Sequence, residues 1–390
     1  MRRVRLKEIG TFYSGLSGKS KSDFSEGNAL LVTYRNIFNN PVLNPAIKDT
    51  VVVGKDEKQN EVLWGDILIT GSSETPADAG MSSVVLFNPQ EKMYLNSFCF
   101  GFRLNDMNEA LPSYIGHLLR STSIRAAISK TAFGVTRFNV NRMRFADIEI
   151  PLPPLNIQKE IVSILDSFTS LIDKMKQEVE MRKKQMEYYR EKLMAPQKNW
   201  KIKTLGEIGT FTRGNGLQKS DFRVKGFPCV HYGQIHTYYN TCIYKTKSFC
   251  EEDLAKKLQK ASYGDLLIAT TSEDVKACCK AAVWFGAGDV AYSGDSFCYS
   301  HDQDPKYMAY LFQTEMFAKQ KQKAATGAKV IRVSGESMAS FSFAFPPLVQ
   351  QCQIASILDT FETYISKLEK MIELRQKQYE YYREKLLTFE

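Results

Sequence analysis

A chain of 390 residues, 43% of them hydrophobic, is long enough for two or three domains with ordinary apolar cores. It contains no run near the ~18 apolar residues that a membrane-spanning helix needs, and its basic first five residues are not followed by the apolar stretch of a secretory signal. The eight cysteines form no C-x-x-C pair and accompany only four histidines. We therefore expect neither a zinc site nor a disulfide framework, and a reducing cytoplasm fits best.

The net charge of +9 is distributed unevenly along the chain. Residues 157–194 and 350–390 together contain 14 basic and 14 acidic residues, so the excess lies in residues 1–156 and 195–349. A basic excess in two globular regions favours a polyanionic partner such as nucleic acid. Charge alone leaves this open, because many basic proteins bind no polyanion.

Residues 1–155 have the pattern of an α+β domain. Four short runs typical of β-strands are separated by clusters of Gly, Asn, Pro and Ser, and a helical candidate follows at residues 113–128. The runs lie at residues 30–34, 50–53, 66–70 and 83–87. We expect a strongly twisted, mostly antiparallel sheet that ends in a Pro-Pro-Leu exit.

Residues 156–194 are predicted to form one long helix. No Gly or Pro lies between Asn156 and Ala195, Pro196 ends the segment, and apolar residues recur at the spacing of a coiled coil. A helix of about 38 residues would be roughly 57 Å long. Its apolar stripe includes Ile161, Leu165, Phe168 and Ile172.

After a linker at residues 195–201 the same order of elements returns. A second α+β domain is expected at residues 202–348, with its helical candidate at 306–325. A second long helix is expected at residues 349–390. Its stripe includes Ile354, Leu358, Phe361 and Ile365.

The two halves are also related letter by letter. The heptapeptide Glu-Tyr-Tyr-Arg-Glu-Lys-Leu occupies residues 187–193 and again 380–386, an offset of 193. Near the start of each half, residues 8–12 recur as 207–211, an offset of 199. The repeat implies two copies of one fold related by a pseudo-two-fold axis. We favour an antiparallel pair of long helices over two independent surface helices, because neither helix alone can bury so long a stripe.

No catalytic motif stands out. Gly18-Lys19-Ser20 resembles the end of a phosphate-binding loop, but Tyr13 occupies the position of the leading glycine. Asp66 and Asp265 recur, yet within Gly-Asp turns that lead into strands, where a turn or capping role is the default. The chain is therefore predicted to be a recognition protein rather than an enzyme, with no catalytic and no metal site.

Several segments resemble the target-recognition domains of type I restriction-modification specificity subunits, the HsdS family. Residues 64–74 and 227–237 carry this resemblance, as do the two helix entries at 155–161 and 348–354. Together with the repeated order of domain, Pro-Pro-Leu and long helix, the resemblance covers the whole chain. The loops before the two exits differ, Gly134–Asn139 against Gly327–Arg332, as the family implies for two domains that read different sequences.

This resemblance implies a non-catalytic DNA specificity subunit. Each domain would read half of a bipartite double-stranded DNA target in the major groove, and the coiled coil would set the spacing between the halves. Two methyltransferase (M) subunits, using S-adenosylmethionine, would dock on the chain. Motor and nuclease (R) subunits, using ATP and Mg²⁺, would add restriction, and no cofactor is expected in the chain itself.

DNA contacts are expected from the duplicated loops and from the divergent glycine loops, since Arg suits guanine and Asn or Gln suits adenine. The candidates in the first half are Thr33, Tyr34, Arg35, Asn36, Ser72, Ser73, Glu74 and Arg137. Those in the second half are His231, Tyr232, Gln234, Thr271, Ser272, Glu273, Lys329 and Arg332. Phosphate contacts are expected from Lys19, Lys21, Arg213 and Lys219. The alternative for each residue is a solvated loop side chain.

Two other functions stay open on the sequence. The chain could be a stand-alone DNA methyltransferase or nuclease with an unrecognised site, which binding of S-adenosylmethionine by the isolated chain would indicate. It could also be a scaffold that binds proteins only, which absence of DNA binding in the presence of M subunits would indicate.

Overall fold

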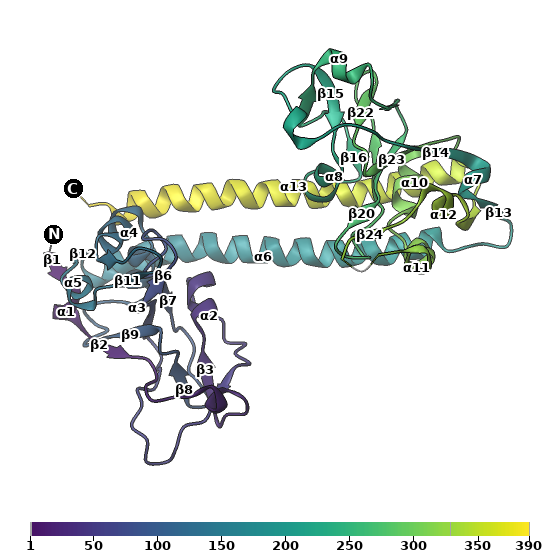
Figure 1. The fold of residues 1–390 in the computed structure, drawn as a ribbon. Helices are drawn as coiled ribbons and strands as arrows, with labels where there is room; N and C mark the ends of the chain where they lie inside the picture. The colour runs from purple at the N-terminus through teal and green to yellow at the C-terminus, as the bar shows by residue number, and fades with distance from the viewer. Residues whose placement is uncertain (1, 328, 390) are drawn as a thin grey trace. The chain divides into compact units, whose positions relative to one another are not determined.

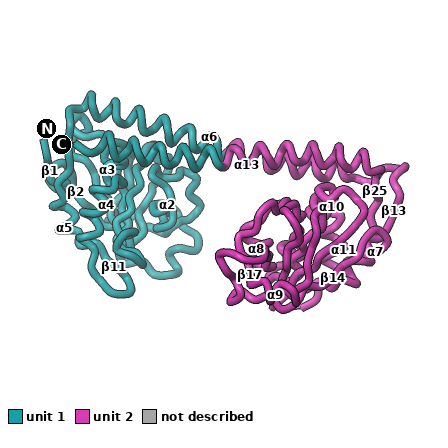
Figure 2. Tube along the Cα trace, turned by 90° about the horizontal axis from the view of Figure 1, so that it is seen from above, with its two compact units in different colours: residues 1–176, 370–390 teal, residues 177–369 magenta. Residues whose placement is uncertain are grey.

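The computed structural model describes residues 2–327 and 329–389 and groups them into two compact units. Unit 1 contains residues 1–176 and 370–390, and unit 2 contains residues 177–369 (Figure 2). Each unit holds one β-rich domain and one end of each of two long helices (Figure 1). We call residues 1–155 domain 1 and residues 202–348 domain 2.

Domain 1 consists of short strands and short helices. Its strands are β1 (Arg2–Arg5), β2 (Gly10–Ser14), β3 (Ala29–Val32), β4 (Thr50–Val51), β5 (Ile67–Thr70), β6 (Ser72–Ser73), β7 (Ser82–Val84), β8 (Met93–Leu95), β9 (Cys99–Leu104), β10 (Ala132–Phe133), β11 (Phe138–Val140) and β12 (Glu149–Leu152). Its helices are α1 (Leu6–Ile9), η1 (Lys21–Phe24), α2 (Tyr34–Asn39), α3 (Pro112–Leu119), α4 (Thr122–Ser129) and α5 (Arg142–Ala146).

The strands of domain 1 form several small sheets around three apolar clusters. The largest is antiparallel, in the order β2-β9-β5-β7, and β3 pairs with β4 antiparallel and with β8 parallel. Strand β5 is buried along its whole length, with Ile67 and Ile69 in one cluster and Leu68 in a second. This alternation follows from the two-residue period of a strand that is covered on both faces.

Domain 2 repeats this arrangement. Its strands are β13 (Lys201–Thr204), β14 (Gly209–Arg213), β15 (Phe227–Val230), β16 (Cys242–Ile243), β17 (Ser248–Cys250), β18 (Lys260–Ala261), β19 (Leu266–Ala269), β20 (Thr271–Ser272), β21 (Lys280–Trp284), β22 (Val290–Tyr292), β23 (Ser296–His301), β24 (Ile331–Arg332) and β25 (Ser342–Phe345). Its helices are α7 (Leu205–Ile208), η2 (Lys219–Asp221), α8 (Tyr232–Thr237), α9 (Glu252–Ala255), α10 (Pro305–Leu311), α11 (Glu315–Ala324) and α12 (Gly335–Ala339).

The main sheet of domain 2 has the order β14-β23-β19-β21-β16, and β15 pairs with β17 antiparallel and with β22 parallel, as β3 does with its neighbours. The α+β class and the mostly antiparallel pairing predicted from the sequence are confirmed. The expectation of one sheet per domain is wrong, because each domain divides its strands among four sheets.

The helical candidates at residues 113–128 and 306–325 are each two helices rather than one. In domain 1 the chain turns at Ser121, whose hydroxyl donates to the Leu118 carbonyl, and α4 begins at the next residue. In domain 2 the Thr314 hydroxyl donates to the Leu311 carbonyl and accepts from the Phe317 N–H, so that it caps α11. Local hydrogen bonding by Ser and Thr thus interrupts a continuous apolar pattern.

The two long helices are α6 (Leu155–Met194) and α13 (Leu348–Leu387), of 40 residues each. Within unit 1, Phe168 of α6 stacks on Tyr382 of α13, with ring centroids 5.4 Å apart. Within unit 2, Tyr189 stacks on Phe361 at 5.5 Å, and Lys183 pairs with Glu369 at 2.8 Å. Contacts further along α6 involve earlier residues of α13, so the helices pack antiparallel. The predicted helix pair is confirmed, and the alternative of two independent surface helices is wrong. None of the helices described here is apolar enough over a sufficient length to cross a bilayer.

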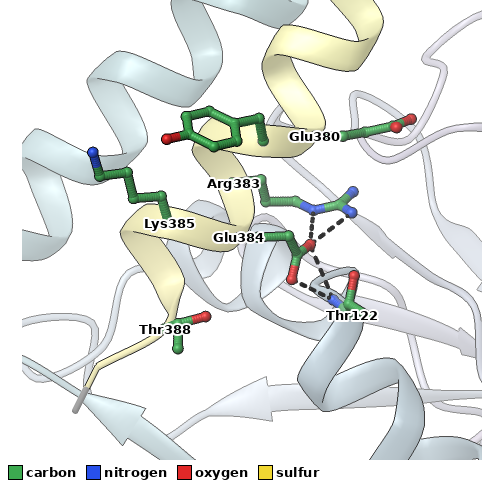
Figure 3. Close-up of a pocket in the computed structure, with 7 residues that line it drawn as sticks. Thr122, Glu380, Arg383, Glu384, Lys385 and Thr388 are labelled. Atoms are coloured by element: carbon green, nitrogen blue, oxygen red, sulfur yellow. Dashed lines mark hydrogen bonds and ion pairs between the residues drawn. The ribbon is translucent and has the colours of Figure 1, made fainter.

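The duplicated heptapeptide has the same role at the end of each long helix. In unit 1 the Glu384 carboxylate accepts hydrogen bonds of 2.9 and 3.1 Å from the N–H of Thr122, the first residue of α4 (Figure 3). In unit 2 Glu191 accepts bonds of 3.2 Å from the N–H of Glu315, the first residue of α11. A carboxylate at a helix N-terminus satisfies free N–H groups and favours the helix dipole. Each copy therefore caps a helix in the domain of the other repeat, which explains why the heptapeptide occurs twice unchanged.

A buried glutamine fixes the start of each long helix. The amide of Gln158 donates to the carbonyls of Pro153 and Glu109, and its oxygen accepts from the Leu111 N–H. Gln351, at the equivalent position, donates to the Pro346 carbonyl and accepts from the Asp304 N–H. These bonds link the Pro-Pro-Leu exit to the domain, so the helix leaves it in a defined direction.

Candidate nucleic-acid interface

The first candidate loop of domain 1 is the start of α2. Thr33 is its N-cap and accepts from the Asn36 N–H, while the Asn36 amide donates to the Asn44 carbonyl at 3.1 Å. Both side chains thus hold the loop. Tyr34 stacks on Phe38 with centroids 5.7 Å apart, and Arg35 is exposed, so these residues are the ones left to meet a ligand.

The matching loop of domain 2 is the start of α8. His231 is buried, which lowers the pKa of its imidazole, and its neutral Nδ1 accepts from the Gly233 N–H at 3.2 Å. The Gln234 amide donates to the Ser248 hydroxyl at 2.7 Å. His231 and Gln234 therefore have structural partners, whereas Tyr232 is half-buried against the His231 ring.

The second candidate loop of domain 1 and its glycine loop meet in the β6–β11 ribbon, which is part of the three-stranded sheet β10-β11-β6. Strand β6 pairs with β11, with Ser73 opposite Phe138, and the Ser72 hydroxyl accepts a 2.9 Å hydrogen bond from Arg137 Nε. A cavity of about 490 Å³ opens beside this ribbon. Its lining residues are Tyr34, Phe38, Ser72, Ser73, Glu74, Thr75, Asp78, Thr136 and Arg137. Apart from the phosphate contacts, five of the eight contacts predicted in this half are thus brought together.

Four lining residues were missed on the sequence: Phe38, Thr75, Asp78 and Thr136. Phe38 follows Tyr34 by four residues and so lies on the same face of a helix, a signal that could have found it. Asp78 is held by the Thr75 hydroxyl at 2.7 Å, a contact without a signature in the sequence.

Domain 2 has the same ribbon, formed by β20 and β24, with Thr271 opposite Arg332 and Ser272 opposite Ile331. Thr271 is buried, whereas Glu273, Lys329 and Arg332 are exposed. A separate cavity of about 310 Å³ is lined by Arg213, His231 and Tyr232, with Gln218 and Asp295 among its other residues. The residues predicted to contact DNA in this half therefore lie in two places, around the β20–β24 ribbon and around this cavity.

The four expected phosphate contacts have different surroundings. The Lys19 ammonium is paired with Glu57, its side chain is only 9% exposed, and the pairing lowers the pKa of Glu57 to about 2. The Lys19 ammonium is thus already paired with a carboxylate of domain 1. Lys21, Lys219 and Arg213 are exposed, and Arg213 donates through Nε to the Gly294 carbonyl.

The candidate helix residues lie in the cores of the two units. Ile161, Leu165 and Ile172 belong to the apolar cluster of unit 1, and Ile354 and Leu358 to the main cluster of unit 2. Phe168 and Phe361 make the two aromatic stacks, and Ile365 is buried.

Asp66 and Asp265 have the turn role expected of them. Asp66 accepts from the Leu63 N–H at 2.8 Å, and Asp265 from the Ser262 N–H at 2.8 Å. Asp66 also accepts from Tyr13 and Arg103 at 2.6–2.8 Å. Burial of the Tyr13 phenol, together with the nearby Asp66 charge, raises the pKa of Tyr13. These partners account for the buried carboxylate without a catalytic role. Among the residues that the structure covers, no group of three or more His, Cys, Asp or Glu is arranged to hold a metal ion.

Comparison with known protein families identifies the family to which this chain of two similar domains belongs. The profile of the type I restriction modification DNA specificity domain matches residues 1–181 and matches again at residues 197–376. The chain belongs to this family. It is a non-catalytic DNA specificity subunit of a type I restriction-modification system.

Relatives of this specificity subunit include a putative type I restriction enzyme specificity subunit of Haemophilus influenzae. The two are 30% identical over 272 residues, which cover 66% of this chain and 68% of the relative. The EcoR124I/EcoR124II specificity subunit of Escherichia coli is 28% identical over 256 residues, covering 62% of this chain and 63% of the relative. The aligned part is thus about two thirds of these proteins.

Two solved structures share the fold. The crystal structure of a type I S subunit from M. genitalium superposes with a TM-score of 0.57 at 14% identity, covering 100% of this chain and 96% of that one. A second, from work on assembly and conformational transition of the type I restriction-modification system, gives a TM-score of 0.59 at 14% identity, covering 99% and 97%. Identities this low establish similarity of fold alone.

Proposed function

We propose that domain 1 and domain 2 each read one half of a bipartite double-stranded DNA target. The observation that carries this is the pair of ribbons, β6–β11 and β20–β24, which share their antiparallel pairing but differ in the side chains of their loops. Two domains that share this strand pairing but differ in their loop side chains suit two half-sites of different sequence.

The proposed contacts are the exposed and half-buried side chains around these ribbons and helix starts. Base contacts are assigned to Tyr34, Arg35, Glu74 and Arg137 in domain 1, and to Tyr232, Glu273, Lys329 and Arg332 in domain 2. Lys21, Lys219 and Arg213 are assigned to phosphates, because exposed basic side chains position a protein on DNA. The major groove is the expected site, since its base edges distinguish all four base pairs.

The long helices are proposed to set the spacing of the half-sites and to dock two M subunits. Support for docking comes from apolar side chains that stay exposed at equivalent positions of the repeat. These pairs are Ile164 with Ile357, Leu171 with Tyr364, Met181 with Leu374, and Tyr188 with Tyr381. Two identical partners would suit two equivalent surfaces, and exposed apolar patches mark such interfaces.

In this account the chemistry belongs to the partner subunits. S-adenosylmethionine would be bound by the M subunits, and ATP and Mg²⁺ by the R subunits, in the cytoplasm where the DNA target lies. Calorimetry of the isolated chain with S-adenosylmethionine should therefore give no binding signal. Binding would instead favour a stand-alone methyltransferase.

The proposal is tested by footprinting the purified complex of this chain with its M subunits on the DNA that it methylates. Two protected stretches of specific sequence, separated by a spacer of fixed length and variable sequence, are expected. A single contiguous protected sequence would contradict two separate readers. Absence of DNA binding by the complex would favour the protein scaffold.

A further inference from the structure

The glycine loops of the two ribbons each begin with a glycine of positive φ but differ in their side chains. Gly134 has φ 137° and Gly327 has φ 101°, values that favour glycine. A Cβ at Gly134 would collide with the carbonyl oxygen of Arg137, and one at Gly327 with that of Val330. Arg137 directly precedes β11 and Val330 directly precedes β24, so the two residues occupy one position of a shared turn.

Two contacts hold the Arg137 side chain so that its guanidinium can meet a planar ligand. Its Nε donates to the Ser72 hydroxyl at 2.9 Å, and its guanidinium lies over the Phe98 ring, 5.3 Å from the centroid. Its two terminal nitrogens have no hydrogen-bond partner in the described part of the chain, and the side chain is exposed. A guanidinium held in this way keeps free the pair of donors that matches O6 and N7 of guanine.

A free acceptor lines the same cavity. Glu74 is exposed, and within residues 2–327 and 329–389 its carboxylate makes no hydrogen bond or ion pair, not even with Arg137. The other carboxylate, that of Asp78, is already bonded to Thr75. A free carboxylate accepts a hydrogen bond from the N4 amino group of cytosine.

We infer that domain 1 reads a G·C base pair in its half-site, with Arg137 on the guanine and Glu74 on a cytosine amino group. Val330 at the equivalent position of domain 2 gives that domain no guanine donor there. The inference rests on the proposed function, and it goes further by naming the bases and the residues that read them.

Domain 2 differs from domain 1 around this position in a consistent way. His236 stands where domain 1 has Phe38. Its Nε2 lies 3.0 Å from the Thr271 carbonyl oxygen, so this nitrogen already has a hydrogen-bond partner within domain 2. The Val330 side chain is apolar and 44% exposed. An apolar side chain suits the methyl group of thymine rather than a guanine edge.

The test is a reciprocal exchange in the full chain, co-purified with its M subunits. Arg137→Val is expected to reduce the preference for guanine at one position of one half-site by about 10-fold or more, as for loss of a bidentate contact. The other half-site should be unchanged. Val330→Arg is expected to create a guanine preference in the second half-site. Both are measured by competition binding with oligonucleotides that vary one base pair at a time.

Two further variants sharpen the result. Glu74→Gln should weaken the preference for cytosine without altering the second half-site, and it keeps the inference testable if Arg137→Val folds poorly. Arg144→Val is the matched control, because Arg144 is an exposed arginine of domain 1 that does not line the cavity. It should leave both half-sites unchanged.

Three outcomes would overturn the inference. A uniform loss of affinity for all sequences in Arg137→Val would make Arg137 a phosphate contact. An unchanged guanine preference in that variant, or a wild-type half-site without any G·C pair, would remove the base contact. Failure of the proposed function looks different, since the wild-type complex would then bind no bipartite sequence at all.

Discussion

Insertion of three heptads into both long helices is expected to lengthen the non-specific spacer of the DNA target by about nine base pairs. Twenty-one added residues extend a helix by roughly 31 Å, and DNA rises ~3.4 Å per base pair. Whole heptads keep the apolar stripe in register. The added length is also close to one turn of DNA, about 34 Å, so both domains would still face the same side of the duplex.

The measurement is the methylated motif of cells that express the altered chain with its M subunits. Both half-sites should stay the same while the spacer grows. The matched control places flexible Gly-Ser segments of equal length at the same points, which should abolish the fixed spacer. A spacer that is unchanged after the heptad insertion would refute the proposed role of the helices.

Leu165→Asp is expected to destabilise unit 1 by about 4 kcal/mol or more, because it removes a buried apolar side chain and buries an unpaired charge. Leu165 is fully buried in one cluster with Tyr114, Phe145 and Tyr379, which join domain 1 to both long helices. From the apolar stripe alone, Asp at positions 165 and 358 is expected to disrupt domain spacing or subunit assembly before the fold of either domain. The shared cluster now leads us to expect loss of the domain and of the pairing together.

The neighbouring residue provides the matched control. Ile164 is 42% exposed, so Ile164→Asp should change the free energy of unfolding by less than about 0.5 kcal/mol. It should nevertheless weaken binding of an M subunit, if the exposed stripe is the docking surface. Thermal unfolding followed by circular dichroism, together with co-purification of the M subunit, separates the two effects. Equal stability of the two variants would contradict the assigned core.

The repeat in the sequence was sufficient to predict the architecture. Offsets of 193 and 199 residues fixed two domains and two long helices, and the apolar stripe with Leu165 and Leu358 predicted their pairing. Ile164 and Leu171 fit the same apolar spacing in the sequence but are exposed in the structure. Heptad spacing gives the period of a helix but not the width of the face that is covered.

The candidate site was less predictable, for physical reasons. Thr33, Asn36, His231 and Gln234 have side chains suited to bases, but short loops use such groups to satisfy their own backbone. Lys19 is occupied by Glu57, which lies 38 residues further along the chain. Spatial partners of this kind cannot be read from local sequence. Glu74, by contrast, was marked by its duplicated loop, and Arg137 by a glycine loop that differs between the halves.

The central claim is that the two domains read independently, and it is tested most directly by a chain in which domain 2 is replaced by a second copy of domain 1. The methylated motif of cells expressing this chain with its M subunits is then determined. We expect two identical half-sites in inverted orientation, with the half-site of domain 2 lost. A motif that keeps the half-site of domain 2 would contradict the account.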